Sequence, residues 1–90
     1  MTIDEAFDKM IANAKEKAKE AMVKFPQPNY VITKFAEESG EVIQAAVHCA
    51  EKRETVENLV KEITQAVAML YRLYAEGDQV HGLPAIAKGE

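Results

Sequence analysis

Three long stretches of the chain carry apolar residues at intervals of three and four, the spacing that puts side chains on one face of an α-helix. The first stretch runs from Thr2 to about Lys24, and Thr2 and Glu5 have the spacing of a capping box at its start. Its apolar positions are Ile3, Phe7, Met10, Ile11, Ala14, Ala18, Ala21, Met22 and Phe25. The pattern predicts a first amphipathic helix.

Two further helices are predicted after the segment 25–29, which contains two prolines. We expect Asn29 to cap a helix over about 30–51, and Thr55 to cap a helix over about 56–76 that stops at Gly77. A short tail, 78–90, follows. No segment alternates apolar and polar residues for long enough to indicate a strand. The sequence therefore predicts an all-α protein, a helical bundle of three main helices.

The third predicted helix has more apolar surface than one small chain can cover. One stripe runs along it, and further apolar residues widen that stripe: Val56, Leu59, Val60, Ile63, Val67, Leu70 and Tyr74, then Met69, Tyr71 and Leu73. We expect copies of the chain to complete the bundle through the second and third helices. The predicted assembly is a homo-oligomer, either a dimer or a dimer of dimers.

Composition limits the partners and the compartment. A chain of 90 residues is one domain, residues 1–90, because two independent cores would not fit. Its 15 acidic and 11 basic residues give a net charge of -4, so no nucleic-acid or anionic-membrane partner is expected. The single cysteine excludes an intrachain disulfide, and no signal peptide or membrane-spanning run is recognisable. A cytoplasmic location is therefore expected.

Glu38 is the most informative residue because it falls inside the apolar stripe of the second predicted helix. At about 100° per residue, Val31 and Cys49 lie within about 20° of it. A carboxylate that faces a core must be paired, protonated or bound to a cation. Two interpretations stay open at this point. Glu38 either pairs with a lysine or arginine of another helix, or it shares a cation site with Glu41 and Glu62, which lie at the borders of their stripes.

The acidic residues also follow a recognisable spacing. Residues 37–41 read Glu-Glu-Ser-Gly-Glu, and 20 residues separate them from Glu62-Ile63-Thr64-Gln65, which opens an apolar helical stretch. This arrangement resembles the E-E-x-x-E … E-x-x-D signature of the MazG-like nucleotide pyrophosphohydrolases, members of the all-α NTP pyrophosphatase superfamily. The resemblance covers roughly residues 30–77.

The resemblance implies a site for Mg²⁺, with Mn²⁺ as an alternative. Glu38 and Glu41 would be metal ligands from the second helix, and Glu62 and Gln65 from the third. Gln65 stands where the family has an aspartate, and its neutral amide oxygen is a weaker ligand that cannot act as a base. Glu37 would be a further ligand or the group that activates water. Glu37 and Glu38 are therefore the catalytic candidates.

Two basic residues are candidates for binding substrate. Lys34 precedes the acids on the second helix, and Arg72 follows them on the third. Arg72 would hold a phosphate or pair with a glutamate. His48, two turns after Glu41, is a weaker candidate for a base or ligand.

The leading expectation is a Mg²⁺-dependent nucleoside triphosphate pyrophosphohydrolase that releases pyrophosphate and a nucleoside monophosphate. A phosphoribosyl-ATP pyrophosphatase shares the superfamily and is an alternative. Gln65 favours another class, a catalytically impaired nucleotide-binding or oligomeric module. A helical adaptor unrelated to nucleotides is left if the match to the motif is accidental.

Overall fold

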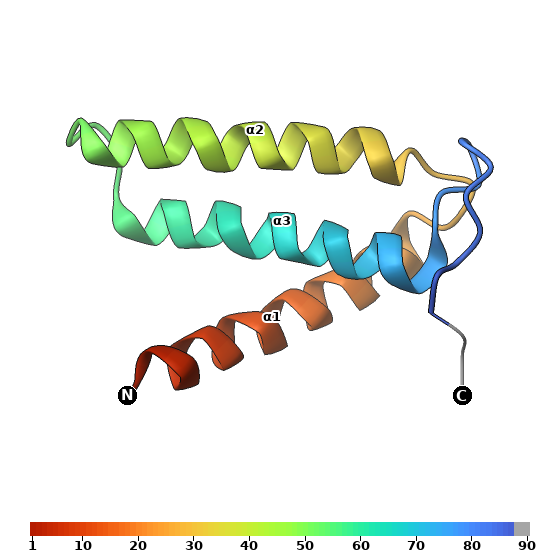
Figure 1. Cartoon of the computed structure of the whole chain (residues 1–90), viewed down its shortest axis with the longest axis horizontal. Coiled ribbons are helices and arrows are strands. Elements are labelled where there is room, and N and C mark those ends of the chain that lie inside the picture. Colours follow the sequence, from red (N-terminus) through yellow and green to blue (C-terminus); the bar gives the residue numbers. More distant parts are fainter. Residues whose placement is uncertain (88–90) are drawn as a thin grey trace.

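Helix α3 (Val56–Glu76) is the central element, and helices α1 (Ile3–Lys24) and α2 (Val31–Ala50) pack against it. The computed structural model describes residues 1–87, so the last three residues of the predicted tail lie outside the described part. Figure 1 shows α2 and α3 side by side and antiparallel, with α1 crossing α3 obliquely on the other side. Within the described residues α1 and α2 do not contact each other. The all-α prediction is confirmed.

The predicted caps of α1 and α3 are confirmed. Thr2 and Glu5 form a capping box, in which each side chain accepts a hydrogen bond from the other residue's backbone N–H, at 3.1 and 2.9 Å. The Thr55 side chain accepts from the Asn58 backbone N–H at 3.1 Å, and Gly77 ends α3 with a φ of 69°. A Cβ at Gly77 would collide with the backbone of Leu83, so only glycine fits this turn.

The predicted cap of α2 is wrong. Tyr30, not Asn29, occupies the N-cap position, and it makes no side-chain hydrogen bond to the helix. The Asn29 side chain instead donates to the carbonyl oxygen of Phe25 at 3.0 Å. Asp78, from the segment after α3, supplies the missing acceptor, because its Oδ2 accepts from the Ile32 backbone N–H at 2.9 Å.

The described residues bury few large apolar side chains. The buried hydrophobic residues are small: Ala14, Ala18, Val31, Ala45 and Ala68. Large apolar side chains line two grooves beside α3 instead, one against α2 and one against the start of α1, and Ile63 borders both. The alanines let the helices approach closely, but they leave the wider apolar faces of α1, α2 and α3 uncovered.

None of the helices in residues 1–87 is both long and apolar enough to cross a membrane.

Candidate functional site

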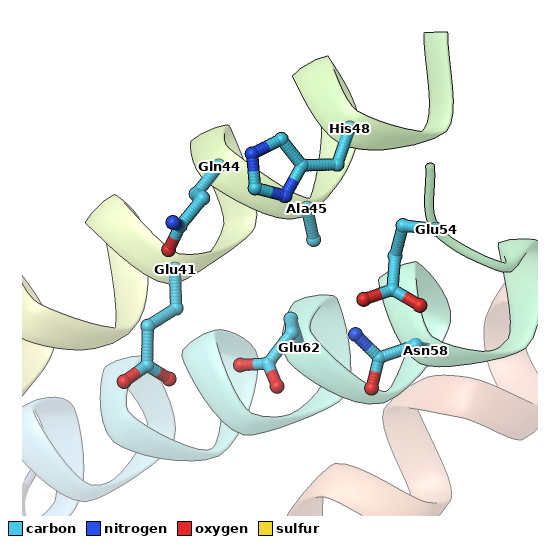
Figure 2. Close-up of a pocket in the computed structure, with 7 residues that line it drawn as sticks. All are labelled: Glu41, Gln44, Ala45, His48, Glu54, Asn58 and Glu62. Atoms are coloured by element: carbon cyan, nitrogen blue, oxygen red, sulfur yellow. The ribbon is translucent and has the colours of Figure 1, made fainter. Parts of the chain in front are cut away.

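Three carboxylates from two helices meet between α2 and α3. Glu38 and Glu41 lie one turn apart on α2, and Glu62 faces them from α3. Each residue offers one carboxylate oxygen, and these oxygens all lie within 4.8 Å of one another. Figure 2 shows Glu41 and Glu62 extending toward each other across the gap between the helices. The antiparallel packing of α2 on α3 therefore creates the cluster, which we call the acidic trio.

The acidic trio has no basic counterpart in the described part of the chain. The ion pairs among residues 1–87 involve other acids, so Glu38 does not form the ion pair that was one of its two interpretations. One carboxylate oxygen of Glu38 and one of Glu62 are buried and have no hydrogen-bond partner. A buried, unpartnered carboxylate oxygen is destabilising unless a proton or a cation satisfies it.

The environment of the trio favours protonation of two of its members. Burial raises the pKa of Glu38, and the neighbouring charges of Glu41 and Glu62 raise it further. Burial also raises the pKa of Glu62, as does the proximity of Glu41, while Lys61 opposes the shift in part. Both shifts have the sign expected when like charges share a poorly solvated site. A divalent cation placed among the three oxygens would remove this repulsion.

A polar cleft of about 310 Å³ opens from the trio along the α2–α3 interface. Glu41 and Glu62 form part of its wall, and the rest comes largely from polar side chains that the sequence did not identify as a group: Gln44, His48, Glu54 and Asn58. In Figure 2 Gln44 and His48 come from α2, Asn58 from the first turn of α3, and Glu54 from the connection before it. No lysine or arginine lines the cleft within residues 1–87.

The remaining candidates from the sequence lie outside the trio. Glu37 is exposed on α2. Gln65 is half-buried one turn after Glu62, and it does not line the cleft. The ammonium group of Lys34 lies 5.1 Å from the centre of the Phe25 ring, toward the beginning of α2.

Arg72 belongs to a structural network at the opposite end of α3 from the cleft. It is almost fully buried, and its Nε pairs with Glu76 Oε1 at 2.5 Å. Its Nη2 donates to the carbonyl oxygen of Phe25. The same oxygen of Glu76 accepts from Gln27 at 2.7 Å. The guanidinium is thus engaged in holding the α1–α2 connection on α3, which is the pairing with a glutamate that the sequence left open.

Asp78 fixes the beginning of the helix that carries Glu38 and Glu41. Its carboxylate is fully buried and accepts from the backbone N–H groups of Ile32 and His81 and contacts the His81 ring, at 2.9, 3.0 and 3.0 Å. Burial alone would raise the pKa of Asp78, but these donors outweigh it and lower the pKa to about 2. The carboxylate is therefore ionised at neutral pH and ties the segment after α3 to α2.

Comparison of the chain with family models, with curated proteins and with solved structures gives no match to any of them.

Proposed function

We propose that this protein is a Mg²⁺-dependent nucleoside triphosphate pyrophosphohydrolase that releases pyrophosphate and a nucleoside monophosphate. The supporting observation is the acidic trio. Its members occupy the positions that carry the resemblance to the MazG-like enzymes, and two of their buried oxygens lack a partner. A charge cluster of this kind, which forms no ion pair with a basic residue of the described chain, suits a cation that in turn binds a phosphate.

The donor set fits a hard divalent cation. Mg²⁺ binds oxygen ligands at about 2.0–2.1 Å, so two ligands on opposite sides of it are about 4.2 Å apart. The 4.8 Å limit on the separations within the trio is slightly larger. Small side-chain rotations, or one bridging water, close the difference. Glu38, Glu41 and Glu62 would hold the ion, and the bound ion would neutralise phosphate charge and polarise the phosphoryl group.

The chain's own residues have separable roles in this proposal. The trio admits a polyphosphate only where a cation offsets its charge, because no lysine or arginine of the described residues lines the cleft. Glu37, an exposed carboxylate next to Glu38 on α2, would orient a water molecule, the role that the resemblance implies for it. Asp78 holds α2 in place at its beginning.

A second candidate function has its own observation. Gln65 stands at the position where the resemblance places the family's aspartate. With a neutral side chain at this position, the site would bind a metal and a nucleotide without hydrolysing the nucleotide. The chain would then be a catalytically impaired nucleotide-binding module.

We also propose that the protein works as a homo-oligomer, a dimer or a dimer of dimers. The groove between α2 and α3 is lined by Phe35, Val42, Ile43, Ile63, Val67 and Leu70, with little polar surface. A second copy presents the same apolar face and covers the groove in a two-fold arrangement. Light scattering after size exclusion tests this, and a 10 kDa species at tens of micromolar contradicts it.

The enzymatic proposal is tested by measuring pyrophosphate release from the common nucleoside triphosphates with Mg²⁺ or Mn²⁺. We expect release by the parent protein and its loss in Glu38→Gln and Glu62→Gln. Glu20→Gln, which removes an exposed charge from α1, is the matched control and keeps the activity. If the parent binds nucleotide and Mg²⁺ but releases no pyrophosphate, the impaired-module alternative replaces the enzyme.

A further inference from the structure

The cleft continues past the acidic trio into a region of different chemistry. Near the trio its wall is carboxylate, but farther along it carries two side-chain amides and an imidazole as well as the Glu54 carboxylate. Among the described residues, the amides of Gln44 and Asn58 make no hydrogen bond that would occupy them. These groups face open space in Figure 2. A cleft of about 310 Å³ is at the lower end of the range for pockets that hold small ligands, about 300–1,000 Å³.

We propose that this distal part of the cleft, formed by Gln44, His48, Glu54 and Asn58, binds the nucleobase and selects bases that carry an amino group. The inference rests on the proposed function, since it takes the trio as the place of the phosphates. A triphosphate can approach an acidic cleft only where a cation is held, which is at the trio. With the phosphates at the trio, the uncharged nucleobase lies in the distal part of the cleft.

The dimensions of the cleft agree with this placement. His48 lies seven residues beyond Glu41, about 10 Å along the axis of α2. On the facing side, Asn58 lies one turn before Glu62, and Glu54 precedes the helix. The two walls therefore run together from the trio over a distance comparable to that between the phosphates and the base of one nucleotide.

Glu54 is the residue that favours bases with an amino group over bases with a carbonyl oxygen. Its Oε1 accepts from the Thr55 backbone N–H at 2.8 Å, which fixes the carboxylate at the end of the cleft. An ionised carboxylate only accepts hydrogen bonds. It pairs with an exocyclic amino group, as acidic residues do with the amino group of cytosine, and the amides of Gln44 and Asn58 can satisfy neighbouring base atoms. Uracil and thymine have a carbonyl oxygen where cytosine has its amino group. That oxygen and the Glu54 carboxylate are both hydrogen-bond acceptors, so they would repel each other.

The test compares the α,β-methylene analogues of CTP and UTP, whose scissile position resists hydrolysis, by calorimetric titration in Mg²⁺. We expect the CTP analogue to bind about tenfold more tightly, the effect of one well-placed hydrogen-bonding pair. Glu54→Gln should bring the two affinities within about twofold, because a glutamine amide also donates to the carbonyl oxygen of uracil. Its side-chain oxygen can still accept from Thr55, so the beginning of α3 is kept.

Glu57→Gln is the matched control. Glu57 is an exposed acid in the first turn of α3, outside the cleft, and its removal should leave the preference for the CTP analogue unchanged. Equal binding of both analogues by the parent, or a preference that survives Glu54→Gln, overturns the base site while leaving nucleotide binding at the trio in place. If neither analogue binds, the base site and the proposed function both fail.

Discussion

Glu38→Gln separates two effects of the acidic trio on stability: charge repulsion in the metal-free protein and metal binding. In the metal-free protein the substitution removes one of three mutually repelling charges and keeps the shape of the side chain. In the presence of Mg²⁺ it removes a ligand. The same variant should therefore be more stable than the parent without metal and less stable than the parent with it, a crossing that a merely structural role for Glu38 would not produce.

The size of the effect in the metal-free protein follows from the geometry. At 4.8 Å two unit charges repel by about 1 kcal/mol in a water-like dielectric, and Glu38 faces two such charges. Partial protonation of Glu38 relieves some of this repulsion already, because its pKa is raised. We expect Glu38→Gln to stabilise the metal-free protein by about 1–2 kcal/mol, which corresponds to roughly 4–16 °C in Tm for a domain of this size.

Mg²⁺ should stabilise the parent protein and leave the stability of Glu38→Gln nearly unchanged. A ligand at 100 times its Kd stabilises the folded state by about 2.7 kcal/mol, or roughly 10–20 °C in Tm. The parent should show this rise, and Glu38→Gln should show little or none. Thermal unfolding with and without Mg²⁺, monitored by circular dichroism, measures both effects, with Glu20→Gln as the charge-matched control. A parent that does not respond to Mg²⁺, or a variant that responds as the parent does, refutes the assignment of the trio as a metal site.

Three further predictions concern neighbouring groups. Gln65→Asp should tighten Mg²⁺ binding and speed pyrophosphate release, and unchanged titration calorimetry would place residue 65 outside the site. The raised pKa values of Glu38 and Glu62 mean that the folded metal-free protein binds protons more readily than the unfolded chain. Its stability should therefore fall as pH rises above the ordinary glutamate value through the raised values, and this part of the pH dependence should shrink in Glu38→Gln. Asp78→Asn should lower Tm by several degrees at pH 7. Because the pKa of Asp78 is lowered from 3.8 to about 2, this loss should persist down to about pH 4 and fade toward pH 2 in unfolding curves.

The three helices could be predicted because their signals are local. Spacings of three and four, the capping box at Thr2 and the glycine after α3 act within a few residues, and the structure follows them. The cap of α2 could not be predicted in this way. Its acceptor comes from Asp78, 46 residues away from Ile32, so an interaction between distant segments takes the place that a neighbouring Asn29 was expected to fill.

The acidic trio could be predicted from the sequence because its signal, like those of the helices, is local. A carboxylate inside an apolar stripe is visible from helical periodicity alone, and Glu38 needed only the antiparallel packing of α3 to meet Glu62. Apart from His48, the distal part of the cleft was not accessible to sequence reasoning. His48 was a weaker candidate from its helical position after Glu41, but Asn58 was not singled out, and Glu54 precedes α3 and has no helical register. Its position depends on how the short α2–α3 connection folds.

The fold and the site place opposing demands on the interface between α2 and α3. Most of the buried apolar residues in the described chain are alanines, which add little hydrophobic stabilisation per residue. The same interface carries three carboxylates whose mutual repulsion opposes folding. A cation and a second copy of the chain would each offset this weakness, the first by neutralising the trio and the second by covering the groove beside it. Since both act on α2 and α3, they should favour each other, and Mg²⁺ should tighten self-association as much as self-association tightens Mg²⁺ binding.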